Sequence, residues 1–398
     1  MIRTHAVPLP LAVLILSAVL LGPAPTPRGR GLPRRQRMTR THAVPLPLAA
    51  LVLSAVLLGP VPAPAAPAKD KEAPPAALEQ QLNDLKRSHE NLEHRLDMLA
   101  KQVDDVAWFV RMSDVAEVDK WRITGPPPAK VKNPKEVGAT NPVRFYTYTF
   151  VPRDRQPGEK LPMLVLPHGG VHADFTTYHV HILRELMRQG YVVVAPEYRG
   201  STGYGRGFYE LIDYGGREVD DCRAATKWAL QNFDFVDSTR VGLIGWSHGG
   251  LIVLMESFQH PQDYRCVFAG MPVSDLILRM GYSEESYRRL FSAPYHIGKT
   301  VDQDQEEYKR RSPVWHVKEL EIPLLIHTNT NDEDVHYVEV EHLIQALKEA
   351  GKQFEYKVYQ DAPGGHSADR LDTPFARGER RDIYAFLAKH LNPPRPAR

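Results

Sequence analysis

The sequence is poor in cysteine and in net charge. Two cysteines among 398 residues, Cys222 and Cys266, are too few for the disulfide framework of a small secreted scaffold. We interpret both as small buried apolar residues, and a single bridge between them stays open. The 50 basic and 48 acidic residues nearly cancel, so a net charge of +2 provides no long-range field to recruit nucleic acid or an anionic membrane. With 42% hydrophobic residues, the composition excludes collagen-like and wholly disordered classes.

Apolar runs long enough to cross a membrane are also missing at the N-terminus, where a sequence is duplicated. The stretch Arg-Thr-His-Ala-Val-Pro-Leu-Pro-Leu begins at Arg3 and again at Arg40, and each copy continues into roughly a dozen apolar residues. This fits a signal-peptide core and falls short of the roughly 20 residues that span a bilayer. We predict that residues 1–68 are a duplicated signal-peptide-like region, in which translation starts at Met38 and the signal peptide is cleaved near Ala68. The protein would then be exported, periplasmic or secreted, without a stable membrane span in the mature chain; an uncleaved anchor is the alternative.

Residues 69–124 are predicted to form a helical segment with a coiled-coil pattern. Apolar residues follow one another in alternating steps of four and three, at Leu78, Leu82, Leu85, Leu92, Leu96, Leu99, Val103, Val106 and Val110. Only His89 breaks this seam, and one polar seam position is a known device for fixing coiled-coil register. Residues 78–110 are therefore a candidate for joining copies of the chain into a homo-oligomer. An amphipathic helix that folds back onto the rest of the protein fits the periodicity equally well.

After a proline-rich linker over residues 125–140, short apolar runs alternate with helical stretches. The runs cover residues 163–166, 191–195, 241–244, 266–269, 323–326 and 354–359. Runs that are apolar on both faces suit buried parallel strands, and their alternation with helices predicts an α/β fold with a doubly wound, mostly parallel sheet. Residues 141–391 would form this domain, and a proline-rich tail, 392–398, follows. Chemistry in such sheets gathers at the carboxyl ends of the strands.

A candidate nucleophile lies at the end of one such strand. The segment Gly-Trp-Ser-His-Gly-Gly, residues 245–250, follows the run 241–244 and opens a helix, which is the context that a G-x-S-x-G nucleophile elbow requires. Glycines leave space for Ser247 to occupy a strained turn with its hydroxyl exposed. The backbone N–H of His248 would then point into the site from a helix N-terminus, where negative charge is favoured.

A serine hydroxyl needs a base, and a carboxylate and a histidine follow in the expected order. Asp332 comes after the run 323–326, and His366 comes after the last strand within Pro-Gly-Gly-His. We favour Asp332 as the acid, while its neighbours Glu333 and Asp334 remain alternatives because the triad is recognised by geometry.

Two further segments would complete the cleft. His-Gly-Gly, residues 168–170, directly follows the run 163–166, where a glycine-rich turn can offer a second backbone N–H to an oxyanion. Tyr198 opens a glycine-rich segment after the next strand, and its hydroxyl would either assist the oxyanion or pack beneath the loop. We expect Tyr198, Gly170 and Trp246 to line the substrate pocket.

The residues over 141–391 resemble the catalytic domain of the prolyl oligopeptidase family of serine peptidases, which has an α/β-hydrolase fold. The matching pieces, in family order, are His-Gly-Gly at 168, Tyr-Arg-Gly-Ser-Thr-Gly-Tyr-Gly at 198, Gly-Gly-Arg-Glu-Val-Asp-Asp at 215, the elbow at 245, Arg-Ser-Pro-Val-Trp at 311, Asp-Glu-Asp-Val-His at 332 and Gly-His at 365. The resemblance implies Ser247 as nucleophile, Asp332 as acid and His366 as base. It places the N–H groups of His248 and Gly169 at the oxyanion.

The sequence departs from the family pattern in three places. Thr328 and one extra residue stand after His327 where the family has His-Gly-x-x-Asp, and Val171 replaces a frequent proline. Members commonly carry a β-propeller that filters substrates, and residues 69–140 are too short and too helical for one. Family rules for recognising peptide termini therefore cannot be transferred.

We thus expect a serine hydrolase that cleaves peptide bonds through an acyl-enzyme, without cofactor or metal and without a nucleic-acid partner. The alternative is a carboxylesterase that acts on small esters with the same machinery. A third hypothesis is a non-catalytic coiled-coil protein, against which the complete set of triad candidates argues.

Overall fold

The computed structural model of the chain describes residues 75–131 and 133–397. The predicted signal-peptide-like region 1–68, the start at Met38 and the cleavage near Ala68 lie outside the described residues. Among those described, no helix is both long and apolar enough to cross a membrane.

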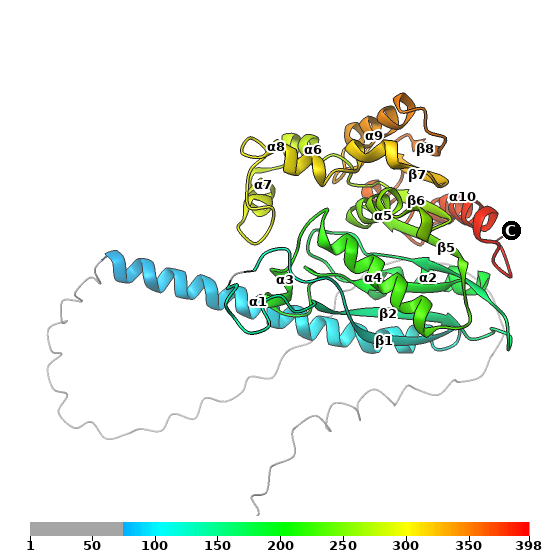
Figure 1. The fold of residues 1–398 in the computed structure, drawn as a ribbon, viewed down its shortest axis with the longest axis horizontal. Helices are drawn as coiled ribbons and strands as arrows, with labels where there is room; N and C mark the ends of the chain where they lie inside the picture. The colour runs from blue at the N-terminus through cyan, green and yellow to red at the C-terminus, as the bar shows by residue number, and fades with distance from the viewer. Residues whose placement is uncertain (1–74, 132, 398) are drawn as a thin grey trace, which may run out of the picture. The chain divides into compact units, whose positions relative to one another are not determined.

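One eight-stranded sheet forms the centre of the described chain (Figure 1). Its strands are β1 (Ala116–Thr124), β2 (Arg144–Pro152), β3 (Leu161–Val165), β4 (Val192–Glu197), β5 (Val236–Trp246), β6 (Cys266–Gly270), β7 (Leu324–Asn329) and β8 (Glu355–Tyr359). The spatial order is β1-β2-β4-β3-β5-β6-β7-β8. Strand β2 is antiparallel to both of its neighbours, and all other pairs are parallel. The predicted mostly parallel, doubly wound sheet is confirmed.

Helices cover both faces of the sheet. They are α1 (Pro75–Met112), α2 (Val180–Gln189), α3 (Arg206–Tyr209), α4 (Arg217–Asn232), α5 (His248–Gln259), α6 (Leu276–Tyr282), α7 (Glu285–Ser292), α8 (Gln305–Arg310), α9 (Tyr337–Glu349) and α10 (Pro374–Leu391). Successive residues of β3 face opposite sides: Met163 belongs to the hydrophobic cluster that includes residues of α4, α5 and α9, and Leu164 belongs to the cluster that includes residues of α1, α2 and α10. Strands buried on both faces need apolar side chains at every position, which is why these strands read as unbroken apolar runs.

The predicted boundary between a helical segment ending at residue 124 and a catalytic domain starting at 141 is wrong. Helix α1 ends at Met112, and Ala116–Thr124 is β1, which pairs with β2 along its whole length. Along the first half of β1, the buried Ala116 and Val118 alternate with the exposed Glu117 and Asp119, the pattern of a strand with one solvated face. Residues 125–140 therefore connect two neighbouring strands of one sheet.

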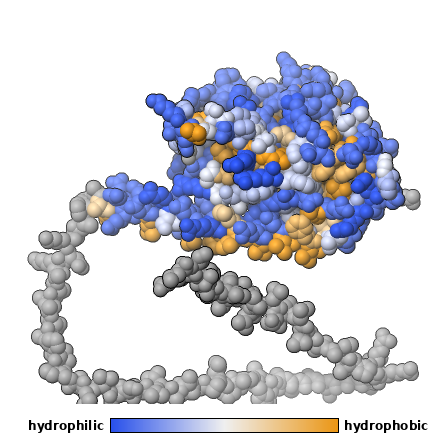
Figure 2. All heavy atoms as spheres, turned by 60° about the horizontal axis from the view of Figure 1, so that its bottom comes forward, coloured by the Kyte–Doolittle hydropathy of each residue, from blue (hydrophilic) through white to orange (hydrophobic). Residues whose placement is uncertain are grey.

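Helix α1 lies against the sheet, but not through its apolar seam. Trp108 and Met112 are fully buried against the body, and the Trp108 ring stacks on Phe175 at 5.4 Å. The seam residues stay exposed: Leu78, Leu82, Leu85, Leu92, Leu96, Leu99, Val103, Val106 and Val110. Figure 2 shows hydrophobic side chains breaking the otherwise hydrophilic surface of the projecting part of this helix. The helix does fold back onto the body, as one of the two hypotheses predicted. It contacts the body through the face that carries Trp108 and Met112, whereas the prediction had the apolar seam in contact.

The two cysteines are both free and buried, Cys222 on α4 and Cys266 on β6. This agrees with their interpretation as small apolar residues and removes the bridge that the sequence left open.

Candidate active site

Ser247 occupies the turn between β5 and α5. Its backbone has φ 59° and ψ −123°, a strained conformation for a residue with a side chain. A Cβ on Gly245 would lie 2.3 Å from the Gly249 carbonyl oxygen, and one on Gly249 would lie 2.4 Å from that of Pro167. Only glycine fits at both positions. The Ser247 N–H donates to the carbonyl of Gly270 on β6 at 3.0 Å, which fixes the turn to the sheet.

His366 and Asp332 form a direct pair at the same edge of the sheet. His366 lies in a 3₁₀ turn, Gly365–Ser367, after β8, and Asp332 follows β7. The Nδ1 of His366 lies 2.9 Å from each oxygen of the buried Asp332 carboxylate. One of these oxygens also accepts the N–H groups of Asp334 and Val335, at 2.9 and 2.8 Å. An Nδ1–H that donates to the carboxylate leaves Nε2 as the basic nitrogen.

The two other acid candidates contact His366 elsewhere. Glu333 accepts the backbone N–H of His366 at 3.0 Å. One oxygen of Asp334 lies 3.7 Å from His366 Nε2, while the other accepts from Arg279 at 2.7 Å. Because only Asp332 contacts Nδ1, it is the carboxylate placed to fix the tautomer of the imidazole.

The three candidate triad residues follow β5, β7 and β8, parallel strands whose carboxyl ends share one edge. Among the described residues, no hydrogen bond joins Ser247 Oγ to His366 Nε2. Such bonds are often long without substrate and tighten in the Michaelis complex.

The loop over residues 168–177, here called the oxyanion loop, lies directly against Ser247. A Cβ on Gly169 would be 3.2 Å from Ser247 Cβ and 3.1 Å from the Trp246 carbonyl oxygen. The next residue, Gly170, has φ +84°, which favours glycine. The backbone of Gly169 and the first N–H of α5, at His248, thus flank the serine, as an oxyanion hole requires.

The His248 side chain turns away from the serine and supports the oxyanion loop. Its Nδ1 lies 2.9 Å from the Gly170 carbonyl oxygen, and its Nε2 lies 3.3 Å from Glu218. The ring stacks on Tyr214 with centroids 3.9 Å apart. No signal in the sequence pointed to this role of Glu218, which lies in a motif noted above only for its likeness to the family.

Two predicted pocket residues are buried beneath the site, so their assignment to the pocket wall is wrong. Tyr198 is fully buried and donates its hydroxyl to the carbonyl of His168 at 2.9 Å, which matches the packing alternative. Trp246 is 2% exposed and donates its indole N–H to Asp369 at 2.8 Å. Side chains alternate along β5, so the residue before the nucleophile faces the core. Gly170 is partly exposed in the oxyanion loop.

The histidines near this loop do not gather around a common point. His172, His179 and His181 each contact a different backbone carbonyl, those of Gly200, Thr176 and Arg370. Within residues 75–131 and 133–397, no group of three or more His, Cys, Asp or Glu side chains is arranged to hold a metal ion.

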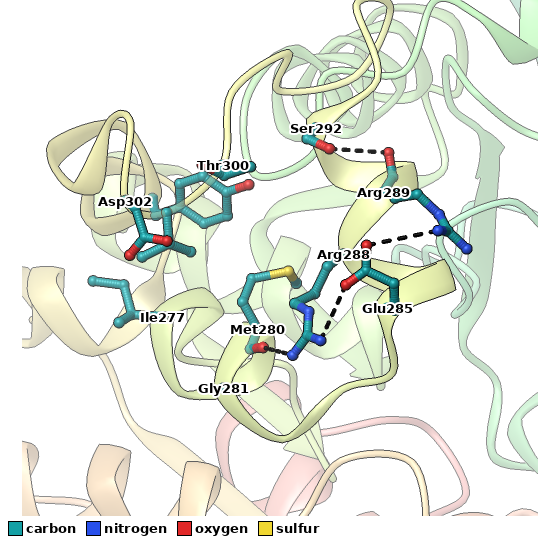
Figure 3. Close-up of a pocket in the computed structure, with 11 residues that line it drawn as sticks. Ile277, Met280, Gly281, Glu285, Arg288, Arg289, Ser292, Thr300 and Asp302 are labelled. Atoms are coloured by element: carbon teal, nitrogen blue, oxygen red, sulfur yellow. Dashed lines mark hydrogen bonds and ion pairs between the residues drawn. The ribbon is translucent and has the colours of Figure 1, made fainter.

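A pocket of about 440 Å³ lies between α6, α7 and the segment 300–308 (Figure 3). Arg288 and Arg289 both pair with Glu285 on its wall, and Arg288 also donates to the Met280 carbonyl. None of the predicted site residues lines this pocket, so it is separate from the candidate active site.

The fold and the site define an α/β-hydrolase with a Ser-His-Asp arrangement. A family model described as "Prolyl oligopeptidase family" matches residues 177–394, more than half of the chain. The chain therefore belongs to the prolyl oligopeptidase family of serine peptidases, and the resemblance inferred from the motifs is confirmed.

Curated relatives and solved structures agree with this assignment. The chain is 31% identical over 233 residues to dipeptidyl peptidase 8 of Mus musculus, covering 56% of this chain and 25% of that protein. It is 26% identical over 254 residues to the acylamino-acid-releasing enzyme of Homo sapiens, covering 63% and 32%. An acylaminoacyl peptidase structure from Pyrococcus horikoshii matches with a TM-score of 0.58 and 18% identity, over 73% of this chain and 44% of that one, and so supports the fold. The chain spans about a quarter to a third of the length of these curated relatives.

Proposed function

We propose that this protein is a serine peptidase that hydrolyses peptide amides through an acyl-enzyme. The observation that carries the proposal is the pair of 2.9 Å contacts between His366 Nδ1 and Asp332, at the sheet edge where Ser247 occupies its strained turn. The names of the relatives, a dipeptidyl peptidase and an acylamino-acid-releasing enzyme, favour short peptides or acylated peptides as the substrate class.

The arrangement performs the reaction in two halves. His366 Nε2 takes the proton of Ser247 Oγ as the oxygen attacks the carbonyl carbon, and Asp332 stabilises the imidazolium that forms. The N–H groups of Gly169 and His248 bind the oxyanion of the tetrahedral intermediate. His366 then gives its proton to the leaving amine, and the acyl group stays on Ser247. A water molecule, deprotonated by His366, attacks the ester and releases the carboxylic acid and the free serine.

The same machinery would hydrolyse an ester, so the test is a comparison of substrates. The wild-type chain should hydrolyse three kinds of chromogenic substrate: acyl-aminoacyl amides, dipeptide amides and short-chain esters. The kcat/KM for the peptide amides should equal or exceed the kcat/KM for the esters. Hydrolysis of the esters with no measurable amide hydrolysis would overturn the peptidase assignment and support the carboxylesterase.

We also propose that the exposed seam of α1 binds the seam of a second copy of this chain. The seam keeps alternating steps of three and four residues from Leu78 to Val110, so its partner needs the same period over a similar length. Among the described helices only α1, with 38 residues, is that long; the next is α10 with 18. A second α1 is therefore the partner that matches.

Analytical ultracentrifugation tests the seam with one matched pair of variants. Leu92→Glu places a charge in the apolar contact and should weaken self-association by about tenfold or more, because burying an unpaired carboxylate is unfavourable. Asn91→Glu, one position off the seam, should sediment like the wild type. A wild-type chain that stays monomeric at all concentrations, or equal behaviour of the two variants, would contradict the proposal.

A further inference from the structure

The face of α1 that lies on the body carries a buried lysine. Lys101 is 3% exposed, and its ammonium donates to the backbone carbonyl of Phe175 at 2.6 Å. It also lies 2.5 Å from a carboxylate oxygen of Glu197 and 3.1 Å from one of Asp174. All three partners belong to the oxyanion loop or to the end of β4 beside it. A lysine from a helix far upstream in the sequence therefore reaches the loop that holds Gly169.

Glu197 links the two ends of the oxyanion loop. Its carboxylate accepts the N–H of Phe175 at 3.2 and 3.3 Å, near the C-terminal end of the loop. The same carboxylate also lies near the first residue of the loop, because one of its oxygens is 3.5 Å from the Nε2 atom of His168. Burial lowers the pKa of His168 to about 3, so its ring is neutral at physiological pH. Lys101 and Glu197 together hold both the N–H and the carbonyl of Phe175.

A second residue of α1 holds the end of the same loop. Asp104 accepts the backbone N–H of Thr177 at 3.1 Å and its hydroxyl at 2.6 Å. The helix also sits close to the neighbouring glycine-rich segment, because a Cβ on Gly203 would lie 2.6 Å from Lys101 Cβ. These contacts leave the loop between its glycines and Thr177 little freedom to shift.

The charges of this cluster depend on one another. Burial raises the pKa of Glu197 to about 7, and Lys101 acts against that shift. Burial lowers the pKa of Lys101, but Glu197 and Asp174 outweigh it and the net shift is upward, so the lysine stays charged. Removing one partner of a buried ion pair leaves the other uncompensated, which is far more disruptive than removing both.

We propose that Lys101 is a positioning residue that fixes the oxyanion loop, so that the Gly169 N–H faces the oxyanion during the reaction. This role rests on the proposed peptidase function and assigns to α1 a part in catalysis. Oxyanion stabilisation acts in the transition state and hardly at all on the bound substrate. A displaced loop should therefore lower kcat and leave KM nearly unchanged.

The test compares Lys101→Met with a matched control in the full-length chain. Lys101→Met should lower kcat by about 10- to 100-fold, less than or similar to the loss of one oxyanion donor, with KM within about twofold. Lys101→Arg keeps the charge and should recover most of the activity. Lys120→Met is the control, because Lys120 also joins α1 to the sheet, through Asp105 at 2.6 Å, and lies over the rings of three tyrosines outside the loop. Within the described residues, Lys120 interacts with Glu197 only through charge and makes no hydrogen bond to the oxyanion loop. It should keep kcat within about threefold.

A second variant keeps the proposal testable if Lys101→Met does not fold. Lys101→Met combined with Glu197→Gln removes both fully buried charges. The remaining carboxylate, Asp174, is 21% exposed and still accepts from Thr202 at 3.0 Å. The double variant should therefore fold while lacking the ammonium contact to Phe175. We expect its kcat to stay about tenfold or more below the wild type, and its affinity for a peptide boronate, which forms a tetrahedral adduct, to fall by a similar factor. Wild-type kcat and boronate affinity in a folded double variant would overturn the role of Lys101. A wild-type chain without hydrolytic activity would instead overturn the proposed function.

Discussion

Replacing Ser247 with alanine should lower kcat by about 10⁴- to 10⁶-fold, because the attack that forms the acyl-enzyme loses its nucleophile while the oxyanion donors remain. KM should change little, since the hydroxyl contributes little to substrate binding. The fold should persist, because alanine meets the same backbone strain at φ 59° that serine does. The measurement is single-substrate kinetics on the best amide of the substrate comparison.

Ser257→Ala is the matched control for this experiment. Ser257 is also buried and lies within α5, and its hydroxyl donates to the Leu254 carbonyl of the same helix. Its removal should leave kcat within about twofold. A fluorophosphonate should label the wild type and the Ser257 variant but not the Ser247 variant. Hydrolysis that survives Ser247→Ala would show that another group attacks the substrate.

The second large effect is expected at the acid. Asp332→Asn should lower kcat by about 10⁴-fold near neutral pH, because an amide facing His366 Nδ1 favours the tautomer with its proton on Nε2. That tautomer cannot accept the serine proton. The substitution is nearly isosteric, so far-ultraviolet circular dichroism and the melting temperature should show a folded protein.

The neighbouring carboxylates provide controls of the same chemistry. Glu333→Gln keeps an acceptor for the His366 N–H, and Asp334→Asn alters a side chain that is 3.7 Å from Nε2 and half exposed. Each should lower kcat by no more than about tenfold. A loss at Glu333 or Asp334 as large as that at Asp332 would mean that the acid is misassigned.

Most of the strands that the sequence revealed are buried, whereas the edge strand β8 is largely exposed. β3 to β8 coincide with predicted apolar runs, although their bounds differ by a few residues. β1 was missed because charged residues, among them Glu117, Asp119 and Lys120, stand between its few buried apolar residues, so that it continues the charged pattern of the preceding helix. The prolines between residues 125 and 140 indicated a linker between domains, whereas this segment connects two strands of one sheet.

The part of the candidate site that could be predicted from the sequence is the set of residues that lie in short motifs. Ser247, Asp332 and His366 each stand next to glycines or follow a strand directly, and the structure brings them to one edge. Lys101 and Glu197 carry no such signal, because a buried lysine on a charged helix face looks the same in sequence as a solvated one. Their contact joins residues nearly a hundred positions apart, which only the folded chain makes visible.

The order of the triad along the chain also has a consequence in time. Ser247 is separated from His366 by 119 residues. At a synthesis rate of roughly 5–20 residues per second, about 6–24 s pass between the synthesis of Ser247 and the synthesis of His366. Until then Ser247 lacks the base that the proposed mechanism requires, so under that mechanism the growing chain could not cut itself or its neighbours on the ribosome.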